Sequence, residues 1–354
     1  MKTIAQFPHG DRRDAHLYLF ADHISIRIQD LQAFARRRDF QYLLKLNSVV
    51  DLRLSLIILF LIFLSCAPGA KEEPRDDSNL KITYDQHKGT ISVFGANEEA
   101  PLLVQNAQEG TRPYIHLIMA PDGKGELTEL SPSHHKHQTG LYWGLKEVNG
   151  RDYFMNWKED YWRRVSADVL TSMGSAVKWQ TVYELLDSTT TPILRETQTW
   201  SFERSEGKLL LDLVWRGQAL KDVTMSKFYV GGLFLRMPWR PGIPAEAVNS
   251  AGQRNAEAEG QRAIWNDVSV RVNGREDMAH ITIFDHPDNN GFPNAWRVDN
   301  ELGVGPSRQI SGDWSIRQNE TEVIRYRLII YTGERDEPFI HRLWKAYACE
   351  LVDL

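Results

Sequence analysis

The sequence lacks three features that would settle its class at once: a set of cysteines, a long apolar run and an excess of basic charge. Cys66 and Cys349 are the two cysteines in 354 residues, so no disulfide framework can hold the fold. No apolar run after Cys66 approaches the roughly 20 residues of a membrane-spanning helix. The net charge of -5 provides no basic surface for nucleic acid, and we expect no such partner. Stability must therefore come from a buried core.

A short apolar block near the N-terminus has the layout of a secretory signal. The block, residues 54–64, is about a dozen residues long, too short to cross a bilayer. Lys45 and Arg53 precede it, and Ser65, Cys66 and small residues follow it. This order of charged, apolar and small residues is typical of a signal peptide and its cleavage site.

The Leu-Ser-Cys ending of the block resembles the bacterial lipobox, in which cleavage falls before the cysteine and its thiol is lipidated. We therefore expect a signal peptide over 45–66, lipidation of Cys66 and a flexible polar tether over 67–79. A lipid anchor would be the sole contact with the membrane, on the periplasmic face or the surface of the bacterial outer membrane. Residues 1–44 precede the charged region that normally starts a signal, so we expect a mis-called start codon there.

The rest of the chain, residues 80–354, has the pattern of a single β domain. Short runs that alternate apolar and polar residues are separated by turn residues, which is typical of strands. The runs predict hairpins over 80–95 and 196–217, and a helix is predicted over 337–351. Many closely spaced strands with little helix predict an all-β fold, a large antiparallel β-sandwich with a short C-terminal helix.

Histidines gather in the segment Ser133–Gly144, SHHKHQTGLYWG. In an extended segment, alternate side chains share a face, so His135 and His137 would project together while His134 faces away. Such a pair could bind a divalent metal or transfer protons near neutral pH. In the alternative interpretation, the imidazoles bond loop carbonyls beside an aromatic floor of Tyr142 and Trp143.

A second polar segment, IFDHPDNN, follows an apolar strand and ends in an acid and a histidine. Asp285 could orient the imidazole of His286, as carboxylates do for catalytic and metal-bound histidines. In the alternative, Asp285 and Asn289 merely bond backbone amides in a turn. Downstream, Trp296 could stack on a sugar ring and Arg297 could bond its hydroxyls, or both could fill the edge of the core.

Arg236 stands in the otherwise apolar segment YVGGLFLRMPW. A buried guanidinium needs a partner because an unpaired buried charge is costly. The partner would be an anionic group of the substrate, or a structural carboxylate such as Asp285.

The segments SHHKHQTGLYWG, GGLFLRMPW and IFDHPDNNGFPNAW together resemble a family of secreted proteins known as PmoA-like, or methane oxygenase PmoA. The resemblance spans roughly residues 110–335. It implies a β-sandwich similar to the galactose-mutarotase supersandwich, and a carbohydrate or sugar-derived ligand. Many members have Asp-His-Pro-His-His-Arg-Gly in the first motif, whereas Gln138 stands here in place of a third histidine. The membrane subunit of particulate methane monooxygenase crosses the bilayer repeatedly, and this chain is not that subunit.

The leading hypothesis is a carbohydrate-active enzyme, a hydrolase, lyase or epimerase on a glycoside or oxidised sugar, that uses histidine acid–base chemistry with or without a divalent metal. We expect the histidines of the first two segments to converge on one pocket. The predicted catalytic residues are His135, His137, Asp285, His286 and Arg236, with His135 and His137 as the metal ligands. The predicted substrate-binding residues are Tyr142, Trp143, Asn289, Trp296 and Arg297.

A second hypothesis is a surface glycan-binding lipoprotein without turnover. Trp143, Trp239 and Trp296 would then form a stacking platform, and the histidines would only donate and accept hydrogen bonds. A deep pocket of convergent histidines and a carboxylate would favour the enzyme, and a row of exposed aromatic rings would favour the binding protein.

Overall fold

The computed structural model describes residues 79–158 and 160–350. The predicted signal peptide, the tether and Cys66 lie outside the described residues. No helix within the described ranges is long and apolar enough to cross a membrane.

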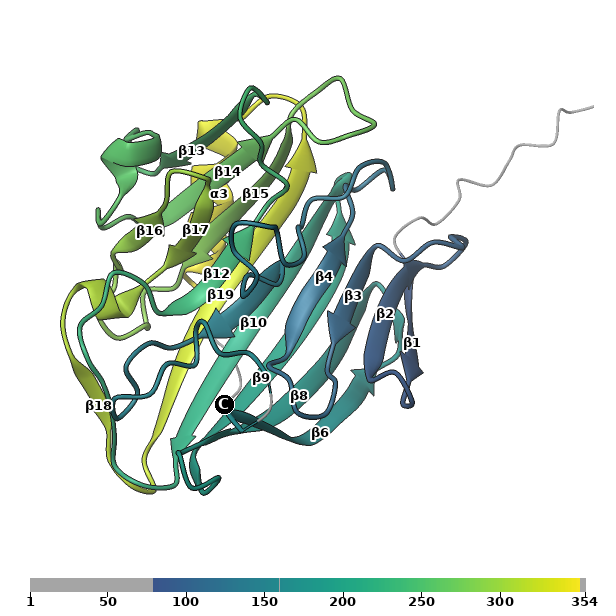
Figure 1. Cartoon of the computed structure of the whole chain (residues 1–354). Helices are drawn as coiled ribbons and strands as arrows, with labels where there is room; N and C mark the ends of the chain where they lie inside the picture. The colour runs from purple at the N-terminus through teal and green to yellow at the C-terminus, as the bar shows by residue number, and fades with distance from the viewer. Residues whose placement is uncertain (1–78, 159, 351–354) are drawn as a thin grey trace, which may run out of the picture. The chain divides into compact units, whose positions relative to one another are not determined.

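Two antiparallel sheets pack face to face and form a β-sandwich (Figure 1). The nine-stranded sheet runs in the order β16 (Trp296–Val298), β17 (Gly303–Pro306), β12 (Gly232–Arg236), β5 (Leu141–Gly144), β4 (Tyr114–Ile118), β3 (Leu103–Asn106), β2 (Thr90–Gly95), β1 (Leu80–Asp85) and β7 (Met173–Gly174). The eight-stranded sheet runs in the order β13 (Ala245–Asn249), β14 (Trp265–Val270), β15 (Ala279–Asp285), β19 (Thr321–Thr332), β10 (Lys208–Ala219), β9 (Pro192–Ser205), β8 (Ala176–Leu186) and β6 (Trp162–Thr171). The strands β11 (Val223–Met225) and β18 (Trp314–Ile316) pair separately, and the described residues also form the 3-10 turns η2 (Asn255–Ala258) and η3 (Arg308–Ile310).

Both predicted hairpins are present. β1 pairs with β2 so that Tyr84 lies opposite Ile91, and Gly89 in their turn has a φ of 61°. β9 pairs with β10 through a turn in which Glu206 and Gly207 have φ angles of 49° and 72°. Two successive positive φ angles match the type I′ turn, whose twist suits a hairpin.

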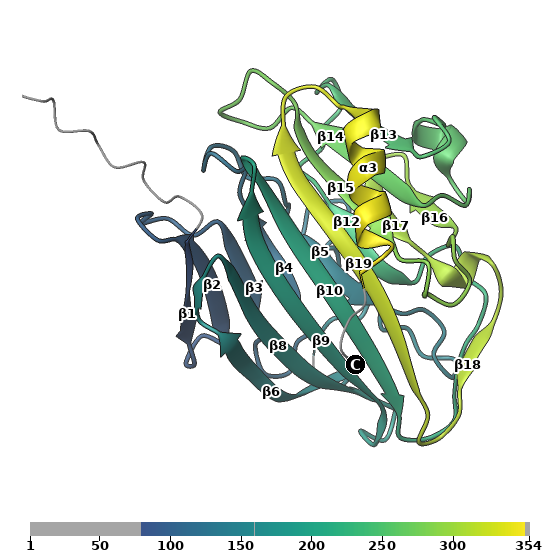
Figure 2. The same ribbon diagram turned by 180° about the vertical axis from the view of Figure 1, so that it is seen from behind.

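The predicted C-terminal helix is also present, as α3 (Glu337–Tyr347). The side chain of Asp336 accepts a hydrogen bond of 2.9 Å from the backbone N–H of Phe339 and caps its first turn. Figure 2 shows α3 across the outer face of the eight-stranded sheet. Its Ile340 and Tyr347 pack there against Trp265 and Phe284, so the helix covers apolar surface on that face. The sandwich and its C-terminal helix confirm the predicted fold class.

Strand alternation sends successive side chains to opposite faces of the nine-stranded sheet. In β12, Leu233 and Leu235 enter the core between the sheets, whereas Phe234 packs in a separate outer cluster. In β5, Trp143 faces the core and Tyr142 faces outward. The nine-stranded sheet therefore has a second, outer face with its own aromatic cluster.

Trp143 and Trp296 are core residues, which corrects their prediction as substrate-binding residues. The ring of Trp143 stacks on that of Trp215, with centroids 4.5 Å apart. Trp296 is fully buried, and its indole N–H donates a 2.8 Å hydrogen bond to the carbonyl of Ala263. Both indoles face inward because they occupy core positions of their strands, so neither can stack on a sugar.

A carboxyl group is also buried in the core. Glu196 on β9 accepts hydrogen bonds of 2.8 Å from the indole N–H of Trp215 and from the amide of Gln198. Burial raises the pKa of this carboxyl to about 7, and the Arg112 guanidinium opposes the shift only in part. The folded state therefore favours the protonated form more than the unfolded chain does.

We expect Glu196→Gln to remove a pH-dependent loss of stability. Since the folded pKa lies above the ordinary value of 4.5, the wild-type protein loses stability as the pH rises from there through about 7, by about 3 kcal/mol in all. Chemical denaturation at about pH 5 and about pH 8 measures this loss in both proteins. Equal losses in wild type and variant would contradict the assignment.

Candidate active site

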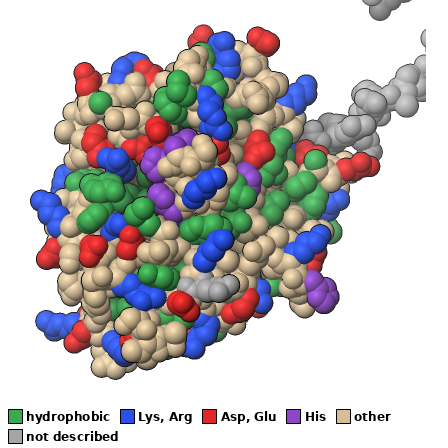
Figure 3. All heavy atoms as spheres, in the orientation of Figure 1, with side chains coloured by type: hydrophobic (Ala, Val, Ile, Leu, Met, Phe, Trp, Pro, Cys, Tyr) green, Lys and Arg blue, Asp and Glu red, His purple; other side chains and the backbone are tan. Residues whose placement is uncertain are grey.

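The outer face of the nine-stranded sheet carries a cavity of about 120 Å³. Its floor is the outer aromatic cluster, in which Phe154 and Phe234 lie in a T-shaped arrangement with centroids 5.2 Å apart. Histidine side chains gather near the middle of this face (Figure 3). The lining combines polar with apolar side chains: His135, His137, Gln138, Phe154, Met155, Tyr229, Val230, Phe234, Arg297 and Asp299.

The histidine segment forms two consecutive turns, not the extended segment that was predicted. The N–H of His135 donates to the carbonyl of Pro132 at 2.9 Å, and the N–H of Gln138 donates to the carbonyl of His135 at 3.0 Å. The turns bring His134 to the same side as His135, because residue alternation does not apply outside a strand. The rings of His135 and His137 remain close, with centroids 5.6 Å apart.

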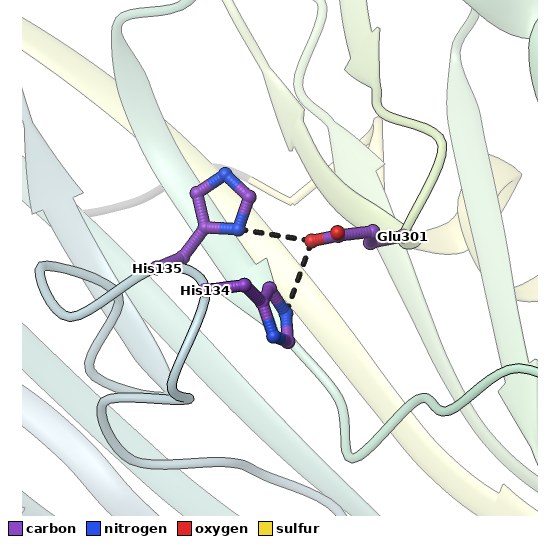
Figure 4. A group of neighbouring side chains, drawn as sticks. All are labelled: His134, His135 and Glu301. Carbon is purple, nitrogen blue, oxygen red and sulfur yellow. Dashed lines mark ion pairs between the residues drawn. The ribbon is translucent and has the colours of Figure 1, made fainter.

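His134 and His135 both point at Glu301, a residue that the sequence analysis missed (Figure 4). The Oε2 atom of Glu301 lies 3.0 Å from Nε2 of His134 and 2.9 Å from Nδ1 of His135. Among the described residues, one group of three or more His, Cys, Asp or Glu side chains brings its ligand atoms within 4.8 Å of one another, and it is this trio. These are the residues that could hold a metal ion.

The loop between β16 and β17 presents Glu301. Oδ1 of Asp299 accepts hydrogen bonds from the backbone N–H groups of Glu301 at 2.9 Å and Gly303 at 2.7 Å. Such a turn closed by an aspartate side chain is common in loops of every function. The sequence therefore offers no signal that separates this turn from an ordinary one.

Arg236 joins the histidine loop to the Glu301 loop. Its Nε atom donates to the side chain of Gln138 and its Nη1 atom donates to the main-chain carbonyl of Glu301. Its Nη2 atom lies 3.5 Å from Oδ2 of Asp299 and 3.6 Å from Oε2 of Glu301. The guanidinium is 1% exposed. Its carboxylate partners are therefore Asp299 and Glu301, not Asp285, and its role is to position the two loops.

Arg112 holds the other side of the histidine loop and was also missed. Its guanidinium donates to the carbonyls of Phe154 at 2.7 Å and His137 at 2.9 Å, and to the hydroxyl of Thr139 at 3.2 Å. It also lies 3.7 Å from the ring centroid of Tyr142. Burial lowers the pKa of Arg112 to about 10, so the group stays cationic at neutral pH.

His137 lies on the wall of the cavity, half-buried beside the ring of Phe154 at 5.7 Å. Burial and, to a smaller extent, the nearby Arg112 guanidinium lower the pKa of its imidazole to about 4. The ring is therefore neutral at neutral pH and has a lone pair free to accept a proton.

The structure does not bring His286 to this cavity. His286 lies on the outer face of the other sheet, where its ring makes a T-shaped contact with Tyr347 of α3 at 4.9 Å. Its Nδ1 atom accepts a 3.1 Å hydrogen bond from the N–H of Asp288. Because α3 covers the outer face of the eight-stranded sheet, this contact places the His286 ring on that face, and His286 does not line the cavity of the histidine loop. The predicted convergence of three histidines is wrong.

Asp285 and Asn289 form a structural turn, as the alternative interpretation held. Asp285 accepts hydrogen bonds of 2.7 Å from the side chain of Asn289 and from the N–H of Asn294, and not from the imidazole of His286 within the described residues. Asn289 also bonds both backbone groups of Arg325. Both side chains are buried and engaged within the turn, so neither reaches a substrate in the cavity.

Comparison with known proteins identifies a family. A protein-family profile matches residues 100–345, more than half of the chain. The chain belongs to the DUF6807 family, a family of unknown function. All the residues that build the cavity, from Arg112 to Glu301, lie inside the matched range. No curated protein matches the sequence.

The sandwich is similar to several solved structures. One is a GH36 α-galactosidase from Geobacillus stearothermophilus, at 8% identity and a TM-score of 0.36, covering 72% of this chain and 41% of that one. Another is a galactose mutarotase related enzyme from Lactobacillus acidophilus, at 8% identity and a TM-score of 0.34, covering 72% of this chain and 99% of that one. The chain thus spans about two fifths of the α-galactosidase. Such distant likeness says nothing about the reaction of this protein.

The predicted substrate-binding residues divide between the site and the scaffold. Arg297 lines the cavity, held by Glu259 at 2.6 Å and lying 5.0 Å from the ring centroid of Tyr229. Tyr142 lies beneath the cavity with 1% of its surface exposed. Of the five predicted substrate-binding residues, Arg297 is thus the one that reaches the cavity wall.

We expect Arg236→Ala to destabilise the protein by about 3–5 kcal/mol, because it removes the fully buried cation that pairs with the part-buried carboxylates of Asp299 and Glu301. Arg240→Ala is the matched control, since that guanidinium also pairs with a carboxylate, that of Glu129, but is 52% exposed. Its loss should cost less than about 1 kcal/mol. Thermal and chemical denaturation measure both, and equal stabilities of the two variants would show that Arg236 is not a structural tie.

Proposed function

We propose that this protein is a carbohydrate-active enzyme, a hydrolase, lyase or epimerase, that acts on a glycoside or an oxidised sugar in the outer-face cavity. The observation that carries the proposal is the placement of His135 and His137 side by side on the wall of a cavity with an aromatic floor. An imidazole at such a wall supplies a group that transfers protons in all three reaction types.

The lining suits a sugar. A pyranose ring has apolar C–H faces and polar hydroxyl edges, and the cavity offers both kinds of partner. Phe154, Phe234 and Tyr229 present aromatic carbon. Gln138, Asp299 and Arg297 present an amide, a carboxylate and a guanidinium around them. Such a mixture orients a polyhydroxylated ring better than a purely apolar pocket would.

His137 is the residue that we assign to proton transfer. Arg112 fixes the main chain of His137 through its carbonyl, so the imidazole starts from a defined position. An acid–base group works only within hydrogen-bond reach of the proton it moves, and a fixed loop meets that requirement better than a mobile one.

The arrangement of tryptophans argues against the glycan-binding alternative. A stacking platform needs rings at the surface, but Trp143 and Trp296 are buried in the core. Trp239 is partly buried and packs against the same core. The described surface therefore carries no row built from these three rings.

We predict that His137→Ala lowers turnover by about 10²- to 10⁴-fold, the usual contribution of a general acid or base. Its stability should barely change, because the half-buried ring lies at the cavity wall. The assay is product analysis on glycosides and their 3-keto derivatives, and the control is His87→Ala, an exposed histidine in the β1–β2 turn. Full turnover by the His137 variant would remove this residue from the mechanism.

We also propose that the protein is a lipoprotein of the bacterial cell envelope, on the strength of the Leu-Ser-Cys motif. Clickable palmitate should label the full chain in a bacterial host and should not label Cys66→Ala. Cys349→Ala serves as the control for the second thiol. Equal labelling of the Cys66 variant would rule out lipidation at that position.

A further inference from the structure

We propose that His134, His135 and Glu301 form a binding site for a divalent transition metal, with Zn²⁺ as the ion that fits best. The ligand atoms are Nε2 of His134, Nδ1 of His135 and a carboxylate oxygen of Glu301. The sequence pattern suggested His135 with His137, so the structure replaces one ligand and adds a carboxylate. The site does not depend on a sugar being the substrate.

Two of the three ligand atoms lack the hydrogen bonds that would otherwise explain their positions. Nδ1 of His135 and Oε2 of Glu301 are shielded from solvent, and neither has a hydrogen-bond partner of good geometry among the described residues. They are nevertheless 2.9 Å apart. Buried polar atoms are rarely left unpaired, because each costs the free energy of its lost hydration. A metal ion between them would satisfy both atoms at once.

The spacing leaves room for an ion after a small movement. Bonds of about 2.0–2.1 Å at tetrahedral angles place neighbouring ligand atoms about 3.3 Å apart. The two nitrogens lie 3.0 Å and 2.9 Å from the carboxylate oxygen. The side chains would have to separate by a few tenths of an ångström, which rotation of exposed or half-exposed imidazoles allows.

The donor set favours zinc over magnesium or calcium. Imidazole nitrogen suits zinc, copper, iron and nickel, whereas magnesium and calcium prefer oxygen alone. Two histidines and one carboxylate are also the ligand set of catalytic zinc sites, which leave a fourth position for water or substrate. His135 lines the cavity, so the open position would face the space that we assign to the substrate.

Arg236 supplies the outer support that such a site needs. It holds the main chain of Glu301 and the side chain of Gln138. Its own charge is shared with Asp299, 3.5 Å away, which reduces its repulsion of an incoming cation. The side chain of Gln138 bonds Arg236 and is therefore not a ligand. His137 stays free for proton transfer.

The test is metal binding by the purified full chain, produced without a histidine tag and stripped by a chelator. Titration with Zn²⁺ by calorimetry and with Co²⁺ by visible absorption should show one ion per chain. His134→Ala, His135→Ala and Glu301→Gln should each weaken Zn²⁺ binding by at least about 10- to 100-fold, the usual effect of losing a residue that only supports a metal ligand. Zn²⁺ should also raise the melting temperature of the wild type and not that of Glu301→Gln.

The matched control is a second histidine–carboxylate pair on the same sheet. His116 on β4 lies 3.3 Å from Glu126, and His116→Ala should bind Zn²⁺ like the wild type. Circular dichroism identifies any variant that fails to fold. If an alanine variant fails, the Zn²⁺ affinity of Glu301→Gln, whose side chain keeps the shape of glutamate, decides whether the site exists. The proposed site is overturned if the wild type does not bind one Zn²⁺ per chain, or if Glu301→Gln binds Zn²⁺ as tightly as the wild type does. Both readouts are independent of turnover, so a failed sugar assay leaves this result standing.

Discussion

The candidate site depends on one buried cation, the guanidinium of Arg236. A charge removed from water must find partners, and this one finds them on two loops that are far apart in sequence. It bonds Gln138 in the histidine loop and the main chain of Glu301, and Asp299 lies close to it. Because Arg236 belongs to β12, the rigid sheet sets the distance between the two loops. The approach of His134 and His135 to Glu301 follows from that constraint.

A second buried arginine complements the first. Arg112 bonds carbonyl and hydroxyl oxygens rather than a carboxylate, so its charge is less fully compensated within the described residues. Together with burial, that charge keeps the imidazole of His137 neutral. The two arginines thus have different roles. Arg236 holds the carboxylates of Asp299 and Glu301 close together, whereas Arg112 holds His137 at the cavity wall and, together with burial, keeps its imidazole neutral.

Strand alternation connects this site to the fold. The positions of β5 and β12 that point inward hold Trp143, Leu233 and Leu235, which fill the core. The positions between them hold Tyr142, Phe234 and Arg236, which form the floor of the cavity and its support. A shift of one residue in either strand would exchange the two sets, so the core that stabilises the sandwich also fixes the outward direction of the functional side chains.

The local features of this protein follow from its amino-acid sequence alone. Alternating residues and turn residues sufficed for the β1–β2 and β9–β10 hairpins, because both depend on neighbours in the chain. The helix α3 was likewise predicted, because a helix depends on residues close together in the chain. The histidine segment stood out by composition, and a buried arginine in an apolar strand implied partners without identifying them.

The long-range contacts required the folded structure, because contacts between distant segments leave no local pattern in the sequence. It placed Trp143 and Trp296 in the core, put His286 behind the opposite sheet and brought Glu301 to His134 and His135, since which face a strand buries and which loops meet depend on how the two sheets pack.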